Sequence, residues 1–84
     1  MHEYSIVAEL VDQVAAAAAG RRVARVHRVQ VAIGEWAGVD VDLLALAFET
    51  FRDGTICAGA VLDIERPAGD EIILQRVEME VSDV

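Results

Sequence analysis

The segment VARVHRVQVAI, residues 23–33, carries the clearest structural signal in the sequence, because apolar and polar side chains alternate along most of it. One face carries His27, Val29, Val31 and Ile33, and the other carries Arg28, Gln30 and Ala32. A period of two is typical of a β-strand with one face against a core and one toward water. We therefore predict a strand from Val23 that places His27 on its apolar face.

The residues before this strand predict an amphipathic helix. Ile6, Leu10 and Val14 recur every four residues, so a helix would bring them onto one face. Ser5 is the candidate N-cap of this helix, and Gly20 is its expected end.

The residues after the strand predict a loop and then a second helix. The loop covers residues 34–39 and contains two glycines. Asp40 is placed to cap the helix, whose apolar stripe is Leu44, Phe48 and Phe51. Gly54 is its expected end.

Two further strands are predicted in the last third of the chain. Leu62 and Ile64 alternate with acidic residues in the first of them, and Pro67 ends it. The stretch PAGD, residues 67–70, is typical of a tight turn into a third strand. We predict that these two strands pair as an antiparallel hairpin.

The third strand contains a break in its alternation. Its apolar positions are Ile72 and Leu74 and then Val77, Met79 and Val81, so the phase slips by one residue. A β-bulge around Gln75 and Arg76 would keep both halves facing the core.

These elements predict an α+β fold for residues 1–84, taken as a single domain. The expected architecture has two layers, a three-stranded sheet with two helices on one face, in the order α-β-α-β-β. A chain of 84 residues makes one small domain.

The charge of the chain limits its partners. Fifteen acidic and seven basic residues give a net charge of −8, which argues against nucleic acid and anionic membranes. No apolar run approaches the roughly 18 residues that span a bilayer. The alanine run at 15–19 follows Glu3, Glu9 and Asp12, which do not suit a signal peptide, so we expect a cytoplasmic protein.

The opening residues Met1-His2-Glu3 are the first candidate site. A terminal amine, the amide nitrogen of residue 2 and a ring nitrogen of His2 can form two fused chelate rings around one metal ion. This nitrogen set suits square-planar or tetragonal nickel or copper ahead of zinc. The alternative is a frayed chain end with a solvated histidine.

Other residues are weaker candidates. His27 is expected to be a satisfied or half-buried histidine more often than a ligand, and Cys57, the single cysteine, a buried structural thiol. Trp36 either docks a partner or covers the end of the core. Glu78 and Glu80 are expected on a solvated strand face.

The arginine cluster and the search for catalytic motifs add no strong candidate site. The arginine cluster either meets an acidic partner or terminates a helix favourably; it consists of Arg21, Arg22, Arg25 and Arg28. The sequence contains no Ser-His-Asp set, phosphate-binding glycine loop or EF-hand spacing, so we predict that the chain is not an enzyme.

Several short motifs, taken in order, resemble those of one known family. They are Met1-His2-Glu3-x-Ser5, IGEWAGV at 33–39, Phe48 followed by Gly54-Thr55, Gly59-Ala60 and Leu62-x-Ile64. Together they resemble the HypA/HybF family of nickel-insertion proteins for nickel-iron hydrogenases.

This resemblance implies a nickel metallochaperone. It implies that Ni(II) binds at the amino terminus through His2, with Glu3 at the same site. With the Met1 amine and the His2 amide and imidazole as donors, a fourth position is left for Glu3, water or a partner's ligand. Glu3 would offer either its carboxylate or its amide nitrogen. The implied partners are a GTPase of hydrogenase maturation and the hydrogenase large subunit, and the implied mechanism is ligand exchange.

One departure from the family pattern concerns zinc. Members carry a zinc-binding segment with two Cys-x-x-Cys pairs between the last two strands, whereas here the turn at 66–71 closes that gap. We therefore expect no zinc in this chain. The alternative function is a metal-free interaction scaffold that docks through Trp36 or an exposed sheet edge, and a sheet edge could also form a homodimer.

Overall fold

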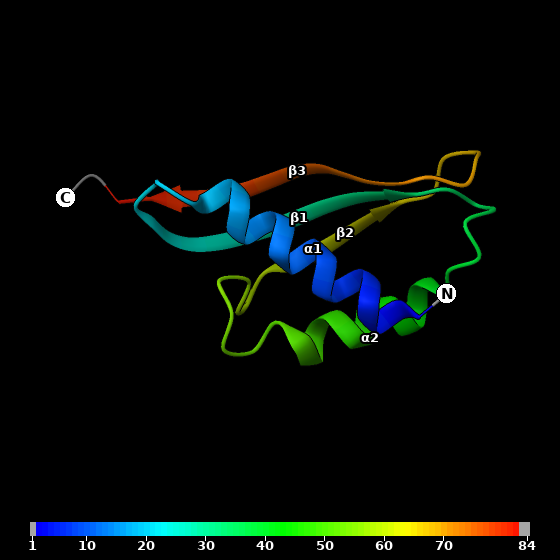
Figure 1. Cartoon of the computed structure of the whole chain (residues 1–84), viewed down its shortest axis with the longest axis horizontal. Helices are drawn as coiled ribbons and strands as arrows, with labels where there is room; N and C mark the ends of the chain where they lie inside the picture. Colours follow the sequence, from blue (N-terminus) through cyan, green and yellow to red (C-terminus); the bar gives the residue numbers. More distant parts are fainter. Residues whose placement is uncertain (1, 83–84) are drawn as a thin grey trace.

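The computed structural model describes residues 2–82 and contains the five predicted elements in the predicted order (Figure 1). They are α1 (Glu3–Ala18), β1 (Val23–Ile33), α2 (Val41–Phe51), β2 (Val61–Glu65) and β3 (Ile72–Val81). The two helices pack against each other and cover one face of the three-stranded sheet. The predicted two-layer α+β architecture is confirmed.

The pairing of the strands differs from the prediction. β1 lies in the centre of the sheet, parallel to β2 on one side and antiparallel to β3 on the other. Val29 of β1 is therefore paired with Leu62 of β2 and with Val77 of β3. The predicted β2–β3 hairpin is wrong, because these two strands are both paired with β1 and not with each other.

The segment predicted as a hairpin turn instead crosses the end of β1. The amide of Gly34 donates to the carbonyl of Glu71 at 2.9 Å, and the amide of Trp36 donates to the carbonyl of Gly69 at 2.8 Å. The guanidinium of Arg66 also donates to the carbonyl of Gly34 at 3.1 Å. These bonds hold the 66–71 connection against the start of the loop that follows β1.

The core lies between the helices and the inner face of the sheet. Its centre contains Leu44 and Phe48 of α2, Val14 of α1 and Val29 of β1, all almost completely buried. Among residues 2–82, no polar or charged side chain is buried. Apolar burial is the main favourable term in folding, so this layer accounts for most of the stability of the domain.

Two irregularities in β1 move His27 away from the core. The register against β3 shifts between Val23 and Arg25 and again between Val26 and Arg28. Val26 consequently faces the core, whereas His27 is exposed and lies 3.3 Å from the carboxylate of Glu80. The prediction that His27 lies on the apolar face is wrong.

The predicted bulge in β3 is confirmed. Gln30 of β1 is paired with Arg76, but the next residue, Val31, is paired with Leu74, so Gln75 is the extra residue. This insertion lets Leu74 and Val77 both pack against the core.

The helix ends agree with the sequence in part. Helix α1 begins at Glu3 with His2 as its N-cap, so the prediction that Ser5 caps it is wrong. Gly20, with φ of 77°, follows its last turn as expected, and Asp40 caps α2 through a bond from the Leu43 amide. No helix within residues 2–82 is long and apolar enough to cross a membrane.

Candidate metal-binding terminus

His2 stands at the start of α1 with its side chain exposed. Its backbone is extended (φ −83°, ψ 112°), and its carbonyl accepts bonds from the amides of Ser5 at 3.1 Å and Ile6 at 3.3 Å. The ring makes no capping bond to the helix. The main chain of His2 is thus part of the helix start while its imidazole faces solvent. Met1, the third predicted ligand, lies outside the described residues.

Glu3 connects this terminus to the second helix. Its carboxylate accepts a hydrogen bond of 3.1 Å from the backbone amide of Asp40, the residue that caps α2. Asp40 in turn accepts a 3.1 Å bond from the amide of Leu43 through its own carboxylate. The carboxylate of Glu3 therefore already has a structural partner, and it holds the first turn of α1 beside the first turn of α2.

Tyr4 provides a second contact between the helices. Its ring meets the ring of Phe51 edge to face, with centroids 5.2 Å apart and an interplanar angle of 82°. Glu3 and Tyr4 therefore both contact the α2 region.

The electrostatics of this region favour a cation only because of its carboxylates. Two helix N-termini meet here, and each carries a partial positive charge from its macrodipole. Glu3, Asp40 and Asp42 stand in or next to these first turns and oppose that charge. Their ordinary role is to stabilise the helices, and the same negative charge lowers the cost of bringing a metal ion near His2.

The described residues alone do not form a complete metal site. Within residues 2–82, no group of three or more His, Cys, Asp or Glu side chains is arranged to hold a metal ion. The ligand set Met1, His2 and Glu3 therefore stays a prediction. Sequence reasoning missed Asp40 as a neighbour of Glu3, because 37 positions separate them and no local pattern connects them.

The other sequence candidates fall outside this site. Cys57 is buried as predicted, and its burial raises the pKa of the thiol above its ordinary value. Trp36 does not cover the core, because 73% of its surface is exposed.

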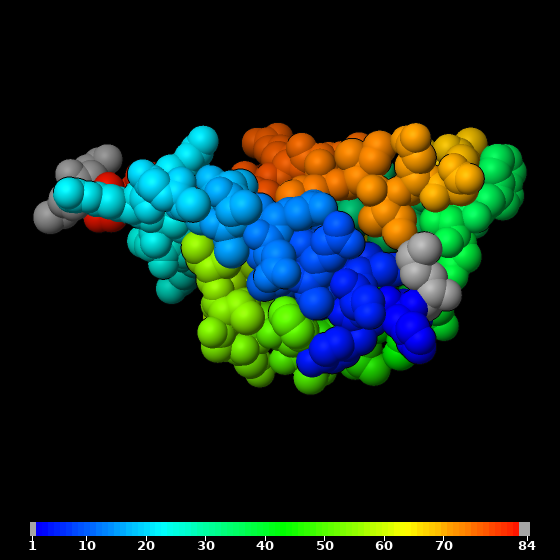
Figure 2. Space-filling view, viewed as in Figure 1, coloured from blue at the N-terminus to red at the C-terminus, as the bar shows by residue number. Residues whose placement is uncertain are grey.

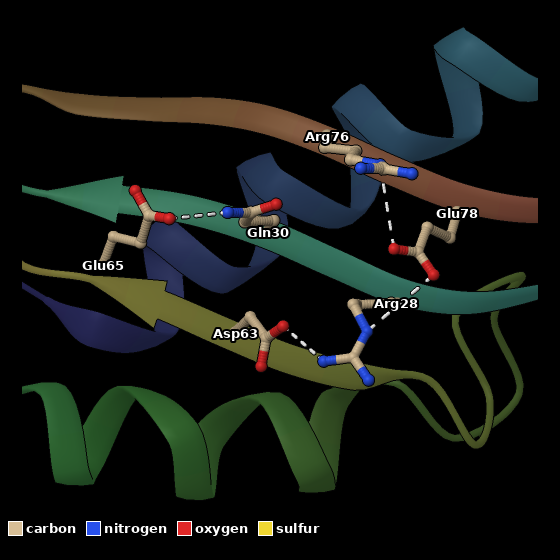
Figure 3. Close-up of polar contacts among 6 residues, drawn as sticks. All are labelled: Arg28, Gln30, Asp63, Glu65, Arg76 and Glu78. Atoms are coloured by element: carbon tan, nitrogen blue, oxygen red, sulfur yellow. Dashed lines mark hydrogen bonds and ion pairs between the residues drawn. The ribbon is translucent and has the colours of Figure 1, made fainter.

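The outer face of the sheet carries a polar network (Figure 3). Arg28 is paired with Asp63 and lies 3.9 Å from Glu78, while Arg76 lies 3.7 Å from Glu78. The bond and charge of Asp63 raise the pKa of Arg28. These side chains point away from α1, and Glu78 and Glu80 are on a solvated strand face as predicted. Exposed ion pairs of this kind contribute little to the stability of the fold.

These observations define a class of protein: a small two-layer α+β domain in which the first helix starts beside the start of the second. The family model described as "Hydrogenase/urease nickel incorporation, metallochaperone, hypA" matches residues 1–79. The chain belongs to the HypA family, which confirms the resemblance inferred from the motifs. The family's described role is that of a metallochaperone and not of an enzyme, as predicted.

Individual relatives agree with this assignment. The hydrogenase maturation factor HypA of Helicobacter hepaticus is 40% identical over 84 residues, which cover 99% of this chain and 64% of the relative. The hydrogenase/urease maturation factor HypA of Helicobacter pylori is 37% identical, covering 99% of this chain and 65% of the relative. The chain thus spans just under two thirds of the length of these curated relatives.

A solved structure gives the same fold. The solution structure of the Ni metallochaperone HypA from Helicobacter pylori matches with a TM-score of 0.73 and 26% sequence identity, covering 99% of this chain and 88% of that one.

Proposed function

We propose that this chain is the nickel-binding domain of a metallochaperone that serves hydrogenase maturation, and that it holds Ni(II) at Met1, His2 and Glu3. The observation that carries the proposal is the exposed imidazole of His2, one residue from the chain start, in a chain of the HypA family. The urease named in the family description is a second candidate recipient.

The ligands we propose are the Met1 amine, the amide nitrogen and imidazole of His2, and the amide nitrogen of Glu3. We favour the Glu3 amide over its carboxylate because the carboxylate accepts the Asp40 amide, whereas the amides of a helix's first turn lack intrahelical acceptors. A set of nitrogen donors suits divalent nickel or copper ahead of zinc.

The mechanism that follows is ligand exchange. A metal at an exposed chain end can be approached by a recipient's own ligands, which replace these donors one at a time while the buried core stays unchanged. We propose a GTPase of hydrogenase maturation and the hydrogenase large subunit as the partners. The cytoplasmic location and the absence of zinc also stay predictions.

The test is a calorimetric nickel titration of tag-free chain that begins at Met1, compared with two variants. One variant is His2→Ala, and the other carries one extra residue before Met1, which converts the amine to an amide. We expect one nickel per wild-type chain and loss of stoichiometric binding in both variants. The thermal midpoint should change little, because His2 is exposed and makes no side-chain cap.

The outcome that rejects the amine as a ligand is tight nickel binding by the extended chain. Normal binding by His2→Ala would reject the whole site. Binding should also weaken between about pH 7.5 and 6, because nickel competes with protons for an α-amine and an imidazole.

A second candidate function is a metal-free interaction scaffold that docks through Trp36. The observation that favours it is the 73% exposure of this indole, on a loop whose backbone is fixed by the bond from the Trp36 amide to the Gly69 carbonyl. A chain with no stoichiometric nickel site would leave this function as the better one.

A further inference from the structure

The two helices carry charges of only one sign. Their acidic residues are Glu3, Glu9, Asp12, Asp42 and Glu49, and no lysine or arginine occurs within Glu3–Ala18 or Val41–Phe51. All seven basic residues of the chain lie in loops and strands. The helical layer therefore presents a negative surface, whereas the outer face of the sheet mixes both signs.

Large apolar side chains are exposed within this negative surface. The exposed fractions are 54% for Tyr4, 49% for Leu43 and 60% for Leu46. Leu43 and Leu46 are three residues apart on α2 and so are neighbours on its surface. We call Tyr4, Leu43 and Leu46 the helix patch. Exposed apolar groups with a polar rim often mark protein interaction sites.

The helix patch adjoins the proposed metal terminus. Tyr4 directly follows Glu3, and the amide of Leu43 is bonded to Asp40, whose own amide is bonded to Glu3. Figure 2 shows the start of α1 lying against α2 on one face of the molecule. A protein bound to the patch would thus have its own side chains close to His2.

From this arrangement we propose that the helix patch docks a protein partner whose surface has an apolar pocket rimmed by lysine or arginine, and that docking places the partner's metal ligands beside His2. The inference rests on the proposed function. Charge complementarity selects this occupant, because a second copy of the chain would bring one acidic helical layer against another. The strand residues Val61 and Ile73 are also exposed, but the charged side chains on the strands are of both signs.

The experiment uses a purified hydrogenase-maturation GTPase as the probe and the full chain as its target. Calorimetry compares wild type with the double variant Leu43→Ser/Leu46→Ser and with the matched control Ile73→Ser, whose isoleucine is 48% exposed on β3. We expect the double variant to bind at least about tenfold more weakly and the control to stay within about twofold of wild type. Wild-type affinity should fall as salt is raised from about 50 to 300 mM.

A second measurement needs no variant. Amide NMR shifts of the labelled wild-type chain, followed during titration with the GTPase, should change around Tyr4, Leu43 and Leu46. Changes confined to β3, equal binding by the double variant, or no binding by wild type would each overturn the docking proposal. Concentration-dependent shifts of the chain alone at these residues would also overturn it, because they assign the patch to a second copy.

Nickel titration of the same proteins separates the two proposals. The double variant should keep the nickel stoichiometry of wild type, because neither leucine is a proposed ligand. A wild-type chain that binds the GTPase at the patch but no nickel would contradict the proposed function and leave the docking surface standing.

Discussion

The inner face of the sheet and the start of α1 differ in almost every physical respect. Val29 and Phe48 are buried in an apolar layer, whereas His2 and Tyr4 are exposed, and the carboxylate of Glu3 accepts a bond from the Asp40 amide. Stability and the proposed metal chemistry therefore depend on different residues. Substitutions in one region can thus test the role of that region without changing the other, provided that the domain stays folded.

The largest effect on stability is expected from Phe48→Ala. Phe48 is 1% exposed at the centre of the core, and removing such a ring typically costs about 3–5 kcal/mol. The matched variant Leu46→Ala removes an exposed side chain from the same helix and should cost within about 0.5 kcal/mol. Urea unfolding of both variants measures the difference, and similar losses would contradict the placement of the core.

A smaller loss of stability is expected from Gly34→Ala, which tests the packing of the 66–71 connection against the end of β1. An added Cβ would lie 2.2 Å from the carbonyl oxygen of Gly69 and 2.4 Å from its carbon. Both are backbone atoms, so we expect a cost near the upper end of the 1–3 kcal/mol typical of overpacking, about 3 kcal/mol.

The control for this variant is Gly20→Ala. Gly20 has open space around it, so only its positive φ of 77° opposes the substitution, at roughly 1–2 kcal/mol. If chemical denaturation shows Gly20→Ala to be the more harmful of the two, the close approach of Gly34 and Gly69 is not a constraint on the fold.

The helices and strands were predictable from local sequence, because apolar residues recur with a different period in each kind of element. The slip between Leu74 and Val77 even located the bulge at Gln75. A similar signal is present in β1: Val23, Val26 and Val29 are spaced by three, as two successive bulges require. That spacing indicates that Val26, and not His27, faces the core.

The order of the strands in the sheet depends on long-range contacts. The alternation of apolar and polar residues identifies a strand but does not show which strand it pairs with. A strand–helix–strand sequence nevertheless favours a crossover between parallel neighbours, as β1, α2 and β2 form here. At the terminus, the resemblance to a family pointed to His2 and Glu3, but the contact between Glu3 and Asp40 joins residues 37 positions apart. Only the folded chain brings these two helix starts together.

A pH-dependent effect is expected at Cys57. Burial raises the pKa of its thiol above the ordinary value of 9.0, so the folded state keeps a proton that the unfolded state loses. The contribution of this thiol to stability is complete below pH 9 and is lost as pH rises above it, by at most about 1.4 kcal/mol per pH unit. Urea titrations at several alkaline pH values should show a steeper decline for wild type than for Cys57→Ala. Parallel declines would show that the thiol ionises equally in both states.

The smallest effect on stability, and the sharpest test of the terminus, is expected from Glu3→Gln. Glutamine keeps an oxygen that can accept the Asp40 amide, but it removes the negative charge from the first turn of α1. Loss of that charge should cost about 0.3–1 kcal/mol, measured as a small shift of the urea midpoint.

Nickel stoichiometry should survive the same substitution, because the ligand that we propose from Glu3 is its backbone amide, which glutamine retains. Affinity should fall only modestly, since one carboxylate near a cation is lost. Loss of stoichiometric nickel binding in a folded Glu3→Gln chain would mean that the carboxylate itself is a ligand. In that case, the bond to Asp40 would have to break when metal binds, and the start of α1 would no longer be separable from the region that it contacts.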